Sequence, residues 1–132
     1  MGTSNLIIRA AEPQDATAIV CLVQELAGAD AAKYPLDQRY VEAYLGSAGC
    51  HVLVAETAGS VIGMLSYLIR PNLYHAGSTC LIEELIVSEA ARGRGAGKAL
   101  LESAIQSARQ TGCAEISVTT MPDNQPAIDF YR

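Results

Sequence analysis

The chain has 132 residues, half of them hydrophobic, with a formal net charge of −5 and an isoelectric point near 4.9. This is the length of one domain, and the low content of charged residues, 17%, excludes a disordered polypeptide. The acidic balance argues against nucleic acid as the main partner, because phosphate binding depends on clustered Lys and Arg. We therefore expect a single domain over residues 1–132.

The first third of the chain predicts one short strand and two helices. Residues 6–9 form an apolar run typical of a strand. Pro13 suits the first turn of a helix, and apolar residues then recur at helical spacing until Gly28. A shorter helix is predicted over residues 36–45, ended by Gly46.

The middle of the chain predicts three successive strands, over residues 51–56, 61–69 and 80–87. Residues 70–78 are expected to form a loop, because Pro, Asn and Gly interrupt the strand pattern there. Three strands without an intervening helix are expected to pair antiparallel.

The last third predicts a helix, a strand and a final helix. The first helix runs from about Gly97 to Gly112, the strand covers residues 115–119, and the final helix begins at Pro126. Strands on either side of a helix pair in parallel through a right-handed crossover. The element order therefore predicts a mixed, mostly antiparallel α/β sheet with helices on both faces.

The segment between Val87 and Lys98 carries the strongest functional pattern. An apolar strand ends at Val87, and a basic loop with three glycines leads into the next helix. Glycines allow a ligand close to the backbone, and the first amides of a helix have no partners inside it, so the segment is typical of a phosphate-binding loop. It is not a Walker A loop, because Ala99 follows Lys98 and Arg92 stands where a Gly is required. Nor does it fit the glycine spacing of a dinucleotide-binding loop.

The order Arg92, two residues, Gly95, one residue, Gly97 resembles the acetyl-CoA signature of the GNAT superfamily of N-acetyltransferases. A Glu-Leu-Ile-Val strand precedes it, and the resemblance covers nearly the whole chain. It implies direct transfer of an acetyl group from acetyl-CoA to a primary amine of a small molecule or peptide. The implied cofactor-binding residues are Leu85, Ile86, Val87, Arg92, Gly93, Arg94, Gly95, Ala96, Gly97, Lys98 and Asn124.

Two adjacent carboxylates, Glu83 and Glu84, stand inside the otherwise apolar fourth strand. Such groups are costly there unless they reach water, a substrate or a partner, and strand alternation predicts that they point to opposite faces. Related family members often carry Glu at the position of Glu83, where it deprotonates the amine directly or through water. Partial burial would raise its pKa and suit that role. Glu84 is the alternative base, or a solvated residue.

The segment with Asn124, Ala127, Phe130 and Tyr131 resembles the family's last conserved helix. There the tyrosine hydroxyl acts as a general acid toward the departing thiolate, and the Asn contacts the cofactor. The resemblance thus assigns these roles to Tyr131 and Asn124.

Other residues that could carry chemistry have weaker patterns. The amine site is expected between the first two helices and residues 70–78, where Tyr34, Tyr40, Tyr44 or Tyr74 could line it. His51 is expected to be structural and His75 to be exposed in a loop. The four cysteines have no paired spacing, so neither a metal site nor a disulfide framework is expected. No signal segment or membrane-spanning apolar run is found, which favours a cytoplasmic protein without membrane contact.

The chain ends before the closing strands of the family pattern, so the sheet is expected to lack them. An uncovered edge strand favours pairing with another chain, and we expect a homodimer packed across this edge. The short C-terminus also leaves two alternatives to an enzyme: a CoA-binding regulatory or vestigial module without turnover, or a partner-binding fragment without cofactor.

Overall fold

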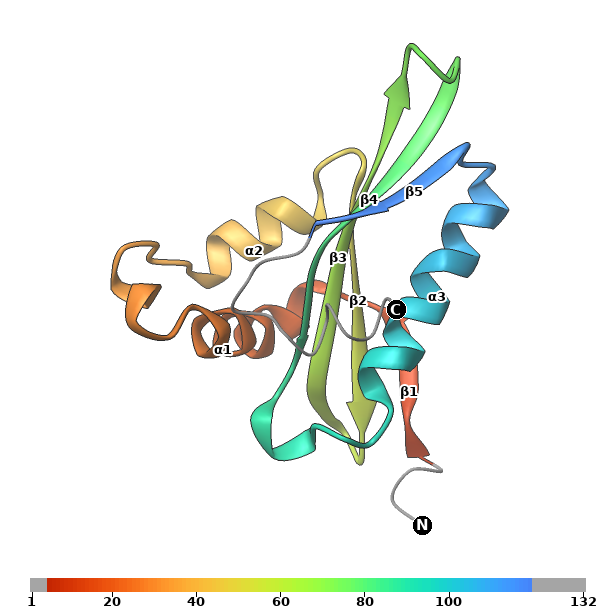
Figure 1. Cartoon of the computed structure of the whole chain (residues 1–132). Coiled ribbons are helices and arrows are strands. Elements are labelled where there is room, and N and C mark those ends of the chain that lie inside the picture. The colour runs from red at the N-terminus through yellow and green to blue at the C-terminus, as the bar shows by residue number, and fades with distance from the viewer. Residues whose placement is uncertain (1–4, 120–132) are drawn as a thin grey trace.

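The computed structural model describes residues 5–119, which form one five-stranded sheet in the order β1-β2-β3-β4-β5. All neighbouring strands are antiparallel except β4 and β5, which are parallel (Figure 1). The strands are β1 (Ile7–Ala10), β2 (Cys50–Thr57), β3 (Ser60–Asn72), β4 (Gly77–Val87) and β5 (Glu115–Val118). The predicted mixed, mostly antiparallel sheet is confirmed.

The described helices begin and end close to the residues that the sequence predicts. They are α1 (Ala16–Ala27), α2 (Gln38–Leu45) and α3 (Ala96–Thr111). Pro13 begins a 3₁₀ turn just before α1, the Asp37 side chain accepts a hydrogen bond from Tyr40 N at the start of α2, and Gly112 ends α3 in a left-handed conformation. The predicted final helix, with Asn124 and Tyr131, lies outside the described residues. No helix within residues 5–119 is long and apolar enough to cross a membrane.

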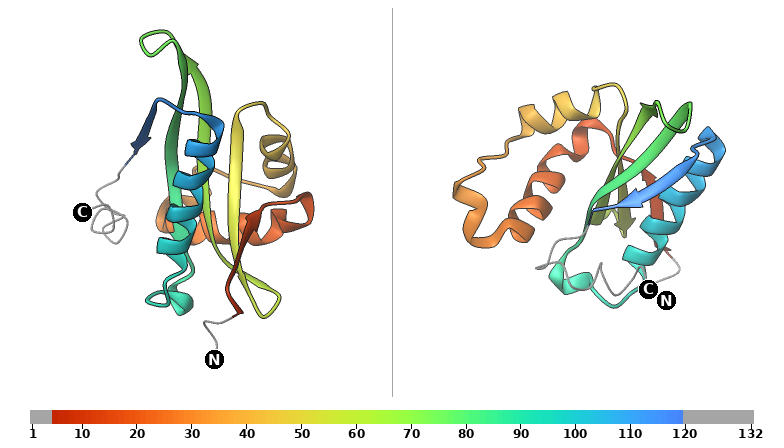
Figure 2. Two further views of the ribbon diagram at one scale, coloured as in Figure 1. Left: turned by 90° about the vertical axis from the view of Figure 1, so that its right-hand side faces the viewer. Right: turned by 45° about the horizontal axis from the view of Figure 1, so that its top comes forward.

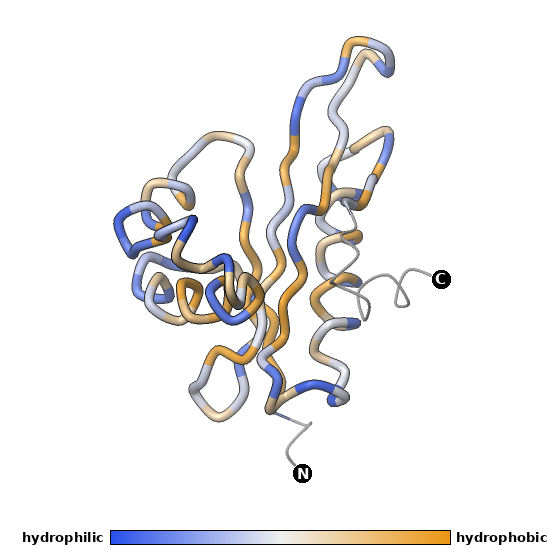
Figure 3. Tube along the Cα trace, turned by 60° about the vertical axis from the view of Figure 1, so that its left-hand side comes forward, coloured by the Kyte–Doolittle hydropathy of each residue, from blue (hydrophilic) through white to orange (hydrophobic). Residues whose placement is uncertain are grey.

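The helices cover both faces of the sheet, as predicted (Figure 2). Helix α3 packs on one face, where Leu100 and Ala104 meet Leu65 and Ile82. Helices α1 and α2 pack on the other face, in a second core cluster: Ala16, Ile19, Leu22, Val41, Val52, Val54, Met64 and Ile86. Apolar residues are concentrated along the middle strands between these helices (Figure 3).

The prediction of a loop over residues 70–78 is wrong. Residues Arg70–Asn72 continue β3, and Gly77 already belongs to β4, so only four residues form the turn. Pro71 pairs with Ser78 inside this hairpin. A proline is tolerated here because its nitrogen faces an edge of β3 that β2 does not reach. Ile69 N donates to Gly49 O, so the nitrogen of Pro71, two residues later, points to the same side, where β2 extends no further than Cys50.

The prediction that Glu83 and Glu84 point to opposite faces is also wrong, because β4 contains a bulge. Ser66 pairs with Glu84 while the next residue of β3, Tyr67, pairs with Ile82, so Glu83 is an extra residue. Ile82 and Leu85 consequently both join the core beneath α3. The alternation on either side of the bulge places both carboxylates on the face covered by α1 and α2.

Candidate acetyl-transfer site

The loop after β4 is held by its ends and open in its middle. Ala91 and Ala96 are buried in the core, whereas Arg92, Gly93, Arg94 and Gly95 between them are exposed. Gly93 and Gly95 have φ values of +82° and +85°, a region that only glycine enters without strain. A Cβ at either glycine would meet no atom of residues 5–119 within 4 Å, so among these residues both border open space.

The first turn of α3 faces this open space with backbone amides that have no partner among the described residues. The first hydrogen bond of the helix runs from Ala99 N to Gly95 O at 3.0 Å, so the amides of Ala96, Gly97 and Lys98 have no acceptor within the helix. Together with the positive end of the helix dipole, they form a site suited to phosphate oxygens.

Two further contacts fix the loop against the body of the protein. The Arg92 side chain turns back, and its Nε donates a hydrogen bond to Val87 O at 3.2 Å. On the other side, Glu25 of α1 accepts a hydrogen bond from Glu89 N at 2.8 Å. The Arg94 and Lys98 side chains are exposed beside the free amides.

The edge of β4 is only partly occupied by β5. The two strands pair from Thr79 with Glu115 to Ile82 with Val118, and Thr119 N donates to Ile82 O. Beyond that point, no strand within residues 5–119 pairs with Leu85, Ile86 and Val87 on this edge. This free stretch leads directly to the loop, so an extended ligand could pair with the strand and reach the helix amides.

The carboxylates lie on the face opposite α3 and differ in their surroundings. Glu84 is exposed, but one carboxylate oxygen accepts a hydrogen bond from Ser66 Oγ, and its backbone N donates to the same hydroxyl at 3.2 Å. Glu83 is half-buried. Burial and the nearby charge of Glu84 raise the pKa of Glu83, while Arg70 opposes this rise.

Ser66 and Tyr44 extend this polar group beneath α2. The Ser66 side chain is completely buried, and Glu84 provides its polar partners. Burial, followed by the charge of Glu84, raises the pKa of Tyr44. The Tyr44 hydroxyl is buried without a hydrogen-bond partner among the described residues. Ser66 is close enough to oppose the pKa rise, but the two hydroxyls are not placed to bond to each other.

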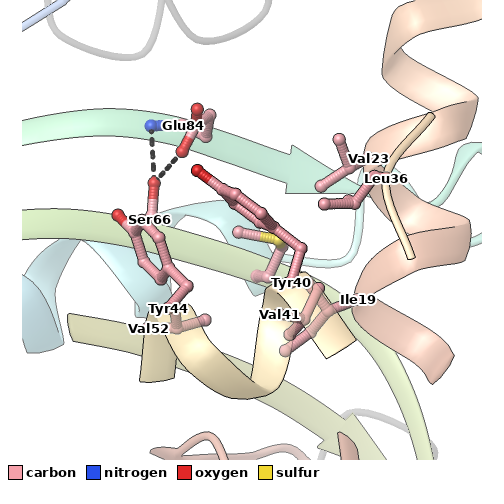
Figure 4. Close-up of a pocket in the computed structure, with 10 residues that line it drawn as sticks. Ile19, Val23, Leu36, Tyr40, Val41, Tyr44, Val52, Ser66 and Glu84 are labelled. Atoms are coloured by element: carbon pink, nitrogen blue, oxygen red, sulfur yellow. Dashed lines mark hydrogen bonds between the residues drawn. The ribbon is translucent and has the colours of Figure 1, made fainter. Parts of the chain in front are cut away.

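These groups open into a pocket of about 130 Å³ on the face covered by α1 and α2 (Figure 4). Its lining comes from both helices, the segment between them, and three strands: Ile19, Val23, Leu36, Tyr40, Val41, Tyr44, Val52, Met64, Ser66 and Glu84. The pocket is therefore apolar apart from Ser66, Glu84 and the two tyrosine hydroxyls.

The structure separates the two histidines from this pocket. His51 stacks on Tyr67 with ring centroids 4.9 Å apart, and Tyr67 belongs to the core on the α3 face. His75 lies in the β3–β4 turn, with Nε2 3.2 Å from a Glu115 carboxylate oxygen. Ser66 was not predicted as a site residue, although a serine inside the apolar run from Met64 to Leu68 is a signal that could have pointed to it.

The sequence of residues 19–132 matches the model of the acetyltransferase (GNAT) family. The match covers most of the chain, so the protein belongs to this family, as its resemblance predicts. The fold agrees: the crystal structure of a transcriptional regulator from Bacillus halodurans C-125 is similar with a TM-score of 0.82, at 28% identity and covering 96% of this chain and 89% of that one.

Two curated relatives are N-acetyltransferases or acetyltransferases by name. The aminoalkylphosphonate N-acetyltransferase of Salmonella typhimurium is 35% identical over 81 residues, which cover 61% of this chain and 53% of that protein. The L-2,4-diaminobutyric acid acetyltransferase of Halomonas elongata is 29% identical over 134 residues, which cover 98% of this chain and 64% of that protein. The chain thus spans between about half and two thirds of the length of these relatives.

Proposed function

We propose that this protein transfers an acetyl group from acetyl-CoA directly to a primary amine. The observation that carries the proposal is the position of two sites on one strand. The end of β4 leads to the free amides at the start of α3, and beside the bulge of the same strand Glu84 lines a pocket on the α1–α2 face, with Glu83 adjacent to it in the chain. Membership of the acetyltransferase family supports the same reaction.

The residues present fit acetyl-CoA. The amides of Ala96, Gly97 and Lys98 would bind the pyrophosphate, with Arg92 and Arg94 adding positive charge. The stretch from Leu85 to Val87, which no strand within residues 5–119 pairs with on this edge, would pair with the pantetheine arm through backbone groups, with Arg92 Nε already bonded to Val87 O. When bound, the cofactor supplies an acetyl group activated as a thioester.

The two carboxylates would divide the work on the amine. Glu84 lines the pocket and is fixed by Ser66, so it would bind the ammonium group of the incoming substrate. Glu83, whose pKa is raised, would accept the proton directly or through water. The neutral amine is then a competent nucleophile, and no covalent enzyme intermediate is needed. Tyr131 as general acid and Asn124 as cofactor ligand remain predictions, because both lie outside the described residues.

Titration calorimetry with acetyl-CoA, followed by release of free thiol with a panel of amines, tests this proposal. We expect cofactor binding and amine-dependent thiol release. Binding without release by any amine would favour the CoA-binding module, and no binding at millimolar acetyl-CoA would favour the partner-binding fragment. The homodimer and the cytoplasmic location that the sequence favours also remain predictions.

A further inference from the structure

The polar and apolar side chains that line the pocket beside Glu84 are separated from each other. The side chains of Ile19, Val23, Val41, Val52 and Met64 give it apolar walls. The rings of Tyr40 and Tyr44 lie beside Ser66 and Glu84, so the polar groups gather in one part of the pocket (Figure 4). A ligand that fits this arrangement has one polar end and one apolar end.

The charge of the pocket lining indicates which polar group a ligand should carry. Glu84 is the one acidic residue among the described residues that line the pocket, and none of them is Lys, Arg or His. Arg70 on β3 opposes the raised pKa of Glu83 but does not line the pocket. A carboxylate or phosphonate on the ligand would therefore face Glu84 without a cation in the pocket to neutralise it.

The hydroxyl of Tyr44 adds a donor and an acceptor that no described residue uses. Its hydroxyl is buried without a partner among the described residues. Buried polar groups without partners are rare and costly, so a ligand group that bonded to this hydroxyl would gain affinity.

The volume of the pocket gives a scale for the apolar end. A cavity of about 150 Å³ lined by aliphatic and aromatic side chains holds benzene. At about 130 Å³, this pocket suits a ring or a branched chain of that size.

We propose that the acceptor is a compact primary amine with an apolar body and no anionic group. The ammonium group binds at Glu84 and Ser66, and the body lies among the apolar side chains of α1, α2 and β2. This inference rests on the proposed function for the transfer step, but the pocket's preference can be measured separately as binding.

A matched pair of ligands tests the preference. Leucine is 3-methylbutylamine with a carboxylate added beside the amine, so the two differ in the group that the pocket should reject. Binding of each to the full chain is measured by calorimetry, with and without CoA, and turnover by thiol release from acetyl-CoA. Ethylamine tests the apolar body, and 2-aminoethylphosphonate tests a second anion.

We expect 3-methylbutylamine to bind and to react with a kcat/KM at least about tenfold above those of the other three amines. Ethylamine lacks part of the apolar body, and one methylene in an apolar pocket is worth about tenfold or more. Leucine and 2-aminoethylphosphonate carry an anion that no cation of the pocket lining neutralises. Val23→Phe should fill the pocket and weaken its binding by a similar factor. Gln24→Phe, which puts the same ring on an exposed position of α1, should leave it unchanged. Thermal melts check that both variants are folded.

The possible results separate the two proposals. Preference for leucine or the phosphonate would overturn this inference and support the transferase. Selective binding of 3-methylbutylamine without thiol release from bound acetyl-CoA would support the inference and overturn the transferase. Absence of binding by 3-methylbutylamine, or equal binding by both Phe variants, would overturn the inference.

Discussion

Glu83 is the extra residue of the β4 bulge, and this position gives it properties that its neighbour lacks. The bulge brings two carboxylates to one face, where the charge of Glu84 and partial burial both raise the pKa of Glu83. A base with a raised pKa transfers protons more effectively near neutral pH than an ordinary glutamate.

We predict that Glu83→Gln lowers turnover by about 10²–10⁴-fold and leaves acetyl-CoA affinity nearly unchanged. The loss should be largest at neutral and lower pH, because at high pH more of the amine is already deprotonated. In the unmodified protein, kcat/KM should fall as the pH drops through the raised pKa of Glu83, and this limb should be absent from the variant. Thiol-release rates across pH and calorimetry with acetyl-CoA provide the measurements.

Glu42→Gln is the matched control for this experiment, since Glu42 is exposed on α2 and does not line the pocket. If Glu84→Gln abolishes turnover while Glu83→Gln does not, Glu84 and not Glu83 is the base that accepts the proton of the amine.

Tyr44 offers a test in which stability and binding change in opposite directions. Its hydroxyl is buried without a partner among the described residues, so Tyr44→Phe removes a polar group that the free protein does not satisfy. We predict that the free energy of unfolding in urea stays the same or rises by about 1 kcal/mol, while affinity for the acceptor amine falls. Tyr34→Phe, at a largely exposed residue, should change neither quantity. A loss of stability in Tyr44→Phe would mean that the hydroxyl has a structural partner.

The connection between β4 and α3 depends on backbone conformation more than on its side chains. The left-handed conformation of Gly95 directs the chain into α3 so that the first amides of the helix face open space. A β-branched residue is strained there even though the protein leaves room for its Cβ.

We therefore predict that Gly95→Val weakens acetyl-CoA binding by about tenfold or more, since such strain costs about 1–3 kcal/mol and would turn the amides away from the ligand. Titration calorimetry measures the effect. Gly46→Val is the control: Gly46 follows α2 with a φ of −91°, and a Cβ there meets no atom closer than 3.8 Å. Equal affinities for the two variants would show that the loop conformation does not control cofactor binding.

At the scale of the whole molecule, a cluster of charged side chains joins β1 to β2 and to the segment just before α1. Arg9 of β1 donates two hydrogen bonds to the carboxylate of Asp15, which precedes α1, at 2.8 and 2.9 Å. It also donates one to Glu56 of β2 at 2.9 Å. Asp15 is nearly fully buried, and the bonds from Arg9 are the main cause of its lowered pKa.

The lowered pKa of Asp15 sets a direction for stability against pH. A carboxyl group whose pKa is lower in the folded state stabilises the protein above its unfolded pKa, near 3.9, and loses this contribution as the pH falls through the folded value. We predict that the free energy of unfolding falls below about pH 4, as measured by urea titration at several pH values. Arg9→Leu should flatten this dependence.

At neutral pH, Arg9→Leu should also cost about 3 kcal/mol, because it leaves a buried carboxylate without its cation. The exposed pair of Lys33 and Asp30, 3.3 Å apart, provides the control. Lys33→Leu should change stability by less than about 1 kcal/mol. Comparable losses in the two variants would show that the Arg9 cluster is no more than a surface ion pair.

The amino-acid sequence alone determined the features that depend on neighbours along the chain. Helical spacing, turn residues and strand runs placed the described helices and strands within a few residues. The order of these elements predicted the antiparallel meander and the parallel β4–β5 pair. The glycines between β4 and α3 predicted a loop that leads into a helix N-terminus, because a helix N-terminus is a local property, and its phosphate-binding role stays a prediction.

Only the tertiary structure decided the features that depend on pairing between distant segments. The bulge at Glu83 arises from the register between β3 and β4, and it reverses the faces that simple alternation predicts. Pro71 lies within a strand because β2 ends before reaching it. The pocket joins Tyr44, Ser66 and Glu84 from α2, β3 and β4, and no local pattern records which side chains meet across a sheet. Local chemistry thus predicted the loop before α3, whereas the contacts between strands and helices formed the pocket beside Glu84.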